Sequence, residues 1–325
     1  MKLHAQIERW PVAGAFTISR GAKTHVDVVV AEIVDGDHVG RGEGTAIYYH
    51  GESAESVLAQ VLAEAQAIED GLTREQLLIR MPRGAARNAI DCALWDLEAK
   101  KTDVPVWKLA ELQRPQSVVT AFTISLGEPE KMEADARAAA HLPLLKLKLA
   151  GEGDEARVAA VRRGAPGARL IVDANEAWTG RDIAAEAAIL AAYGVELIEQ
   201  PVKAGQDALL DGVISPIPFA ADESCQDRVD LTRCVGRYQA INIKLDKAGG
   251  LTEALALAAE AKVMGLEVMV GCMLATSLGI APAFLVAQQA RWIDLDGALL
   301  LAEDRPSAMQ AKDGLLEPPG PELWG

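Results

Sequence analysis

Charged residues close five short apolar runs in the middle of this chain, and they recur at nearly even intervals. The successive steps are 27, 26, 23 and 22 residues, about one strand plus one helix each. A charge at the end of an apolar strand is a poor core residue, because burying it unpaired costs free energy. Repeated with this spacing, the pattern predicts the rim of a parallel (β/α) barrel, where functional sites lie at the carboxyl ends of the strands. The five positions are Lys146-Leu147-Lys148, Asp173-Ala174-Asn175, Glu199, Asp222 and Lys244.

From Val118 onwards, apolar strands and amphipathic helices alternate regularly. Eight strands with seven intervening helices are predicted, and no eighth amphipathic helix follows Asp296. We therefore expect an α/β fold, a modified TIM barrel of the (β/α)7β type over residues 115–300, with residues 301–325 as a tail that packs back on the N-terminal part. The predicted strands span residues 118–126, 144–149, 169–174, 195–200, 218–223, 240–245, 266–271 and 291–296.

Residues 1–114 do not follow this rhythm and predict a separate α+β domain. Residues 4–12 and 24–36 alternate as strands, and residues 39–47 are expected to pair back across the Asp35-Gly36-Asp37 turn. Helices are predicted from Ser53 to about Asp70, from Thr73, and over ARNAIDCALWDLEAKK at 86–101, whose apolar spacing fits simple packing.

Composition narrows the possible partners and the compartment. The chain has 325 residues and a net charge of −15, so a nucleic-acid or anionic-membrane partner is not expected. Its four cysteines form no CxxC motif, and we find neither a leader segment nor an apolar run of membrane-spanning length. These features favour a cytoplasmic protein. They leave the oligomeric state open, and a homo-oligomer is possible.

Three acids end three adjacent predicted strands, the third, fourth and fifth. They are Asp173, Glu199 and Asp222. Three neighbouring carboxylates repel one another unless a divalent cation neutralises them, and oxygen-only ligation suits Mg²⁺. The alternative is three separate salt bridges to loop lysines or helix ends.

Two lysine positions are expected to face each other across these acids. Lys146 and Lys148 are two residues apart, so both point to one side of their strand. Lys244 ends the sixth strand, four strands further round an eight-stranded barrel, which is diametrically opposite. An isolated KxK motif usually lies on a solvated sheet face, but helices cover the outside of a barrel.

Two opposed amines beside a metal-bound carboxylate can remove and return a proton at the α-carbon. The cation stabilises the enolate, and nearby positive charge from Lys146 and Mg²⁺ lowers the pKa of the base. If one lysine removes the proton and the other returns it, the configuration inverts, which predicts a racemase or epimerase. The five histidines lie away from the strand ends, and no dinucleotide, P-loop or G-x-S-x-G motif occurs.

Together these motifs resemble the enolase superfamily, muconate-lactonizing-enzyme subgroup. The resemblance covers essentially the whole chain and implies that the α+β domain caps the barrel. It implies Mg²⁺ on Asp173, Glu199 and Asp222, with Lys148 and Lys244 as the two bases. Lys146 would lie against the substrate carboxylate. The residues that carry the resemblance are KLK at 146–148, DAN at 173–175, IEQP at 198–201, ADES at 221–224 and NIKLDKAGGLTEAL at 242–255.

The eighth-strand motif is similar to that of dipeptide epimerases. Asp294 and Asp296 form a D-x-D pair, which in such enzymes holds the free α-ammonium of a dipeptide. Two loop carboxylates after the strand are the alternative. Thr123, Cys272 and Leu274 match positions that line the substrate, although a serine is often seen where this chain has Cys272.

Arg20 resembles an arginine that binds a glutamate side chain, which makes L-Ala-D/L-Glu the expected substrate and cell-wall peptide metabolism the expected role. A solvated loop arginine is the alternative. Rival activities on the same fold are o-succinylbenzoate synthesis, N-acylamino acid racemisation and muconate cycloisomerisation, whose substrates carry no ammonium for the D-x-D pair. A different class of protein would be a non-catalytic, metal-bound binding barrel.

Overall fold

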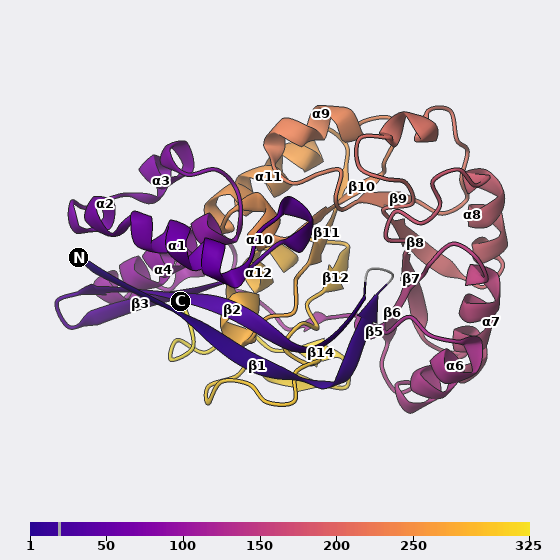
Figure 1. Ribbon diagram of the computed structural model, residues 1–325, viewed down its shortest axis with the longest axis horizontal. Coiled ribbons are helices and arrows are strands. Elements are labelled where there is room, and N and C mark those ends of the chain that lie inside the picture. The colour runs from indigo at the N-terminus through magenta and orange to yellow at the C-terminus, as the bar shows by residue number, and fades with distance from the viewer. Residues whose placement is uncertain (19–20) are drawn as a thin grey trace.

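The computed structural model describes residues 1–18 and 21–325, and it consists of an antiparallel sheet with helices followed by a parallel barrel (Figure 1). The first sheet has the order β1-β2-β3. The predicted pairing across the turn is confirmed, with Asp35 opposite His38 and Gly36 in the left-handed region. The strands are β1 (Lys2–Ile18), β2 (Gly21–Asp35) and β3 (His38–Thr45).

Helices cover one face of this sheet. Ser53 and Thr73 begin helices with capping boxes, as their positions predict. The helix predicted from Ser53 to Asp70 is interrupted at Glu64, which ends α1 and precedes α2. The elements are η1 (Tyr48–His50), α1 (Ala54–Ala63), α2 (Ala65–Glu69), α3 (Arg74–Arg80), α4 (Ala85–Thr102) and α5 (Val106–Leu109).

Strand β3 and helix α4 approach very closely because small residues line both. Three glycines alternate on one face of β3, and a Cβ on any of them would overlap α4 at Ala85, Ala89 or Ala93. Those alanines recur every fourth residue, which places them on one face of the helix. The glycines are Gly40, Gly42 and Gly44.

Eight parallel strands form the second sheet, in the order β12-β11-β10-β9-β8-β7-β6-β5. The backbone N–H of Ala121 donates to the carbonyl of Ile293 at 2.8 Å and brings the two edges together. The predicted barrel architecture is therefore confirmed. Its strands are β5 (Phe122–Ile124), β6 (Leu144–Lys148), β7 (Arg169–Asp173), β8 (Val195–Glu199), β9 (Phe219–Ala221), β10 (Ala240–Ile243), β11 (Glu267–Gly271) and β12 (Trp292–Asp294).

Two details of the predicted barrel are wrong. The first predicted strand, 118–126, divides, and β4 (Val118–Val119) joins a small sheet with β13 (Ala311–Lys312) and β14 (Leu315–Leu316). The connection between β8 and β9 contains only the 3-10 helix η2 (Asp207–Leu210) instead of an α-helix. Three prolines and two glycines between residues 201 and 218 explain this, because neither residue supports a helix interior.

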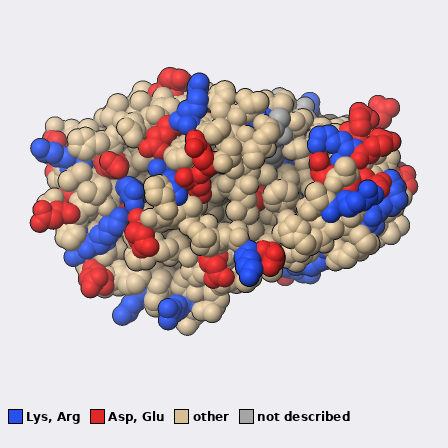
Figure 2. Space-filling view, turned by 90° about the horizontal axis from the view of Figure 1, so that it is seen from below, with Lys and Arg blue, Asp and Glu red and all other residues tan. Residues whose placement is uncertain are grey.

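The remaining connections carry helices of varying length around the outside of the barrel (Figure 1). Among the described residues no helix is both long and apolar enough to cross a membrane. Acidic and basic side chains lie side by side on the face in Figure 2. The helices are α6 (Pro129–Ala138), α7 (Asp154–Gly164), α8 (Ile183–Ala191), η3 (Arg228–Asp230), α9 (Leu231–Cys234), α10 (Leu245–Ala248), α11 (Leu251–Val263) and α12 (Ser277–Ala287).

The C-terminal tail contacts the first domain at both of its ends. Leu301 forms a bridge with Val12, and the indole N–H of Trp324 donates to the carbonyl of Cys92 at 3.0 Å. The N–H of Gly325 donates to Asp96 at 2.8 Å. The boundaries after residues 114 and 300 remain predictions.

Candidate active site

Two successive layers of inward-facing side chains lie inside the barrel, and each of the eight strand segments contributes one residue to each layer. The lower layer is apolar and buried, and it consists of Ala121, Leu144, Ile171, Leu197, Ala220, Ala240, Met269 and Trp292. Because side chains on a strand repeat every second residue, the next interior position lies two residues further along each strand. That layer is Thr123, Lys146, Asp173, Glu199, Asp222, Asn242, Gly271 and Asp294. The change from apolar to polar over one step of two residues places the site at the carboxyl ends of the strands.

The three predicted acids converge, and lysines lie between them. Lys146 Nζ is 2.5 Å from Glu199 Oε2 and 3.7 Å from Asp173 Oδ2. Lys244 Nζ is 2.7 Å from Asp222 Oδ2 and 3.9 Å from Glu199 Oε1. Each of these two lysines therefore bridges a pair of the acids.

Lys148 and Lys244 stand at opposite ends of this row of acids. Lys148 Nζ lies 2.7 Å from Asp173 Oδ2, whereas Lys244 pairs with Asp222. Strands β7, β8 and β9 separate β6 from β10 along one arc of the barrel, and β5, β12 and β11 separate them along the other. The two ammonium groups therefore approach the barrel axis from opposite walls.

The space that Lys244 needs comes from a missing side chain on the neighbouring strand. A Cβ at Gly271 would lie 2.7 Å from Asn242 Oδ1 and 3.0 Å from Lys244 Cε. Asn242 in turn donates from Nδ2 to Glu199 Oε1 at 2.7 Å. Any larger residue at position 271 would displace the side chain of Asn242 and crowd Lys244.

Burial and like charge act strongly on the acids. Burial, reinforced by Asp173, raises the pKa of Glu199 to about 7. Burial also acts to raise the pKa of Asp222, but Lys244 and Lys247 hold it well below its usual range. The pKa of Asp173 is lowered in the same way, by Lys148 and Lys146 against burial.

The acids in turn act on the lysines. Burial alone would lower the pKa of Lys146, but Asp294 and Glu199 raise it well above its usual value. For Lys244, Asp222 and Glu199 likewise overcome burial and raise the pKa. The sequence predicts a lowered pKa for a lysine base, whereas the protein groups around Lys244 raise its pKa.

The chemistry of the donors suits a divalent cation. Asp173, Glu199 and Asp222 are fully buried carboxylates, and oxygen donors of this kind are the ligands that Mg²⁺ prefers. The ammonium groups of Lys146 and Lys244 now supply the positive charge between them. Among the described residues, no group of three or more Asp, Glu, His or Cys side chains has the arrangement of a metal site.

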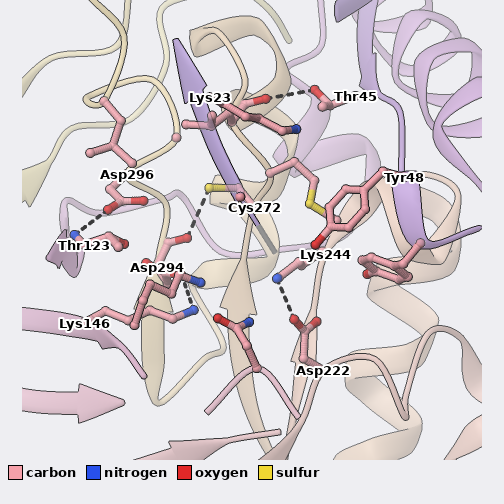
Figure 3. A pocket seen from close by; sticks show the side chains of 18 of the residues that line it. Lys23, Thr45, Tyr48, Thr123, Lys146, Asp222, Lys244, Cys272, Asp294 and Asp296 are labelled. Carbon is pink, nitrogen blue, oxygen red and sulfur yellow. Dashed lines mark hydrogen bonds and ion pairs between the residues drawn. The ribbon is translucent and has the colours of Figure 1, made fainter. Parts of the chain in front are cut away.

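The D-x-D pair lies on the opposite side of the cavity from Asp222 (Figure 3). Asp294 Oδ2 pairs with Lys146 Nζ at 2.7 Å. Asp296 Oδ2 accepts from the backbone N–H of Thr123 at 2.7 Å, and burial, with Asp294 nearby, raises the pKa of Asp296 to about 7. Cys272 Sγ donates to the carbonyl of Asp294 at 3.3 Å.

A cavity of about 270 Å³ joins these groups to the first domain. Of the predicted site residues that the structure describes, Asp173 and Glu199 do not line this cavity. Arg20 lies outside the described residues. The predicted residues in the wall are Thr123, Lys146, Lys148, Asp222, Lys244, Cys272, Leu274, Asp294 and Asp296.

Several wall residues escaped the sequence analysis because they come from the first domain. Lys23 is exposed as a residue, but partial desolvation lowers its pKa, although Asp27 acts to raise it. Its ammonium group lies 5.5 Å from the ring centre of Tyr48. The sequence analysis relied on charged residues at the ends of barrel strands. The residues from the first domain lie far from those strands in sequence, so this pattern did not identify them. The first domain contributes Gly21, Ala22, Lys23, Thr45, Ala46, Tyr48 and Tyr49 to the wall.

Comparison with known proteins supports a single family over nearly the whole chain. Residues 2–110 match the N-terminal domain of mandelate racemase / muconate lactonizing enzyme, and residues 131–321 match the enolase C-terminal domain-like model. The chain is 45% identical to the L-Ala-D/L-Glu epimerase of Escherichia coli K12, over 95% of this chain and 97% of that protein. It is 42% identical to an N-acetyl-D-glutamate racemase from a Pseudoalteromonas species, over 92% and 95% of the two chains.

Solved structures agree with these matches. A crystal structure of an enolase family member from Agrobacterium tumefaciens, with bound sodium and L-Ala-L-Glu, has a TM-score of 0.98 and 51% identity, and covers 100% of this chain and 99% of that one. A dipeptide epimerase from Enterococcus faecalis, complexed with Mg and L-Leu-L-Tyr, has a TM-score of 0.91 and 32% identity, with coverage of 98% and 96%.

Proposed function

The chain belongs to the mandelate racemase / muconate lactonizing enzyme family of the enolase superfamily and is an isomerase, and we propose that it is a Mg²⁺-dependent dipeptide epimerase. The proposed substrate is L-Ala-D/L-Glu, and the inverted centre is the α-carbon of its C-terminal residue. The observation that carries the proposal is the placement of Lys148 and Lys244 at opposite ends of one row of buried acids.

We assign the two lysines to proton transfer on the two faces of the substrate. Lys148 and Lys244 each have a carboxylate 2.7 Å away that fixes the direction of the ammonium group. A neutral amine at one position takes the α-proton, and the ammonium at the other returns a proton to the opposite face. Inversion requires both residues, since each reaches one face only.

We assign Asp173, Glu199 and Asp222 to the cation. A divalent cation held there would supply positive charge for the substrate carboxylate as the α-proton leaves. Lys146 lies among the same acids and would meet that carboxylate from the β6 side. The cation would also offset the carboxylates that now raise the pKa of Lys244.

The D-x-D pair supports a substrate with a free ammonium. Asp294 and Asp296 both line the cavity, on the β12 side. Burial and the negative charge of Asp294 raise the pKa of Asp296, and an α-ammonium beside it would favour its ionised form. N-acetylated substrates have no such group.

Lys23 supports an acidic side chain on the residue that is inverted. It is the cation that the described part of the first domain contributes to the cavity wall. Although Lys23 is exposed, it lines the cavity, where its ammonium group would attract a carboxylate. Arg20 remains a prediction for the same role.

A second candidate follows from the Pseudoalteromonas relative, which acts on a glutamate derivative without a free ammonium. Deuterium exchange at the glutamate α-carbon separates the two candidates. The protein would be incubated in D₂O with Mg²⁺ and either L-Ala-L-Glu or N-acetyl-L-glutamate, and followed by NMR. We expect faster exchange of the dipeptide. Faster exchange of N-acetylglutamate would favour the second candidate, and exchange of neither would refute both.

A further inference from the structure

Two adjacent side chains after Lys244 point in opposite directions, one into the barrel and one into the first domain. Lys247 is fully buried in the barrel, and its Nζ donates to the carbonyls of Asp222 at 2.5 Å, Cys225 at 3.0 Å and Asn242 at 3.0 Å. It also pairs with Asp222 Oδ1 at 2.6 Å. The base and Lys247 therefore share one carboxylate, and this end of the segment is fixed to the barrel.

Asp246 fixes the same segment to the first domain. Its Oδ1 accepts from the backbone N–H of Thr45 at 2.9 Å and from Asn88 Nδ2 at 2.9 Å. Thr45 Oγ1 donates to the carbonyl of Leu274 at 3.0 Å. Since Thr45 and Leu274 both line the cavity, Asp246 connects Lys244 to two parts of the cavity wall.

Helix α4 closes on the segment immediately beyond Asp246. Arg87 Nη2 donates to the carbonyl of Ala248 at 2.6 Å, and its Nε donates to that of Gly249 at 2.9 Å. A Cβ at Gly249 or Gly250 would overlap the side chains of Arg87 or Asp91. The segment cannot shift without moving the first domain.

We propose that Asp246 is a positioning residue, which holds Lys244 in register with the cavity wall formed by Thr45 and its neighbours. Asp246 does not touch the substrate. Its effect falls on the face of the substrate that Lys244 serves, because Lys148 is carried by β6 and pairs with Asp173. This inference rests on the proposed function, since it needs two proton transfers on opposite faces.

The test compares exchange from the two epimers. L-Ala-L-Glu and L-Ala-D-Glu are incubated separately in D₂O with Mg²⁺, and the initial rates of deuterium incorporation are measured. Lys244→Ala identifies the epimer whose exchange depends on Lys244. In Asp246→Ala we expect exchange from that epimer to fall roughly tenfold or more relative to the other, because small displacements of a base are costly. Asp246→Asn keeps the acceptor oxygen and should keep the wild-type ratio of rates.

Thr252→Val is the matched control. It removes another bond between α4 and the barrel, since Thr252 Oγ1 donates to Asp91 and accepts from the indole N–H of Trp95. We expect it to lower the melting temperature without changing the ratio of exchange rates. If Asp246→Ala does not fold, Asn88→Ala removes one of the two donors to Asp246 and should shift the ratio in the same direction.

Equal slowing of both epimers by Asp246→Ala, or by Asn88→Ala in its place, would overturn the inference and leave the proposed function intact. Failure of the wild-type protein to exchange either epimer would overturn the proposed function and the inference together.

Discussion

At the scale of single residues, the two lysines have the same chemistry but different surroundings. Lys148 has Asp173 beside it, whereas Lys244 lies between Asp222 and Glu199 and shares Asp222 with Lys247. If each serves one face of the substrate, removing either lysine leaves the other half of the reaction chemically possible.

We therefore expect Lys148→Ala and Lys244→Ala to have complementary defects. Each should lower α-proton exchange from one epimer of Ala-Glu by about 10²- to 10⁴-fold, the usual contribution of a general base. Each single variant should also abolish epimerisation, because inversion requires both lysines. NMR exchange from each epimer in D₂O measures this. If both variants lost exchange from the same epimer, the two-face assignment would be wrong.

A second residue-scale prediction concerns the cation. Glu199→Gln keeps the shape of the side chain and removes one of three negative donors. We expect a loss of Mg²⁺ affinity by at least tenfold, since hard cations bind charged oxygen ligands far better than amides. Isothermal titration with MgCl₂ measures it, with Glu196→Gln on the half-exposed outer side of the same strand as the control. Unchanged affinity would remove Glu199 from the ligand set.

Asp246 also makes stability depend on pH. Burial, together with the nearby Glu43 and Glu52, raises its pKa to about 7 from 3.8, so the folded state binds its proton more tightly than the unfolded chain. Its contribution to stability is therefore complete below pH 3.8 and is lost as the pH rises towards 7. Asp246→Asn should reduce the fall in unfolding free energy across this window, as denaturant melts would show. If the unfolding free energy of Asp246→Asn fell with pH as steeply as that of the wild type, a group other than Asp246 would be responsible for the pH dependence.

At the scale of elements, local sequence decides where helices and strands begin, and close packing decides how they meet. The three glycines of β3 exist because α4 lies against that strand with its alanines inward. The same helix turns polar side chains towards the barrel, where Arg87, Asn88 and Asp91 bind the segment after Lys244. One helix thus forms both the core of the first domain and its contact with the barrel.

Gly42→Ala tests the β3–α4 packing. The new Cβ would overlap the carbonyl of Ala89, and the helix backbone cannot move as a flexible side chain would. We expect a loss of about 1–3 kcal/mol in the free energy of unfolding, the usual cost of overpacking. Gly167→Ala, where nothing lies within 4 Å, is the control and should be close to neutral. Equal effects of the two would rule out steric overlap as the cause.

At the scale of the whole molecule, the tail joins the first domain to the loop after β11. Arg305 Nη2 pairs with Glu43 Oε2 and Glu8 Oε2 at 2.8 Å each, and its Nε donates to Thr276 Oγ1 at 2.6 Å. Burial raises the pKa of Glu43, although Arg305 and Thr276 oppose the shift. Three segments far apart in sequence therefore depend on one guanidinium.

Arg305→Met should destabilise the protein by about 3–5 kcal/mol, because it leaves the buried carboxylate of Glu43 without its cation. Adding Glu43→Gln should recover part of the loss, since the uncompensated charge is then gone. Thermal and denaturant melts of the two single variants and the double variant measure the coupling. Additive effects in the double variant would mean that the pair does not interact.

The sequence by itself determined the barrel and which of its strands end in charged residues. The alternation of side-chain direction along a strand is a local property. Ile171 and Asp173 are two residues apart on one strand, so their side chains point to the same side. It also predicted the absence of an eighth helix, and it failed at residues 201–218, where prolines and glycines replace the expected helix.

Only the tertiary structure decided how these residues are paired and what closes the cavity. Lys146 pairs with Asp294 across 148 positions of chain, and Asp246 accepts from Thr45 across 201. The wall from the first domain, with Lys23 and Tyr48, has no local signature. The physical reason is that pairing of buried charges and close packing depend on distances in space, which a local pattern of residues does not specify.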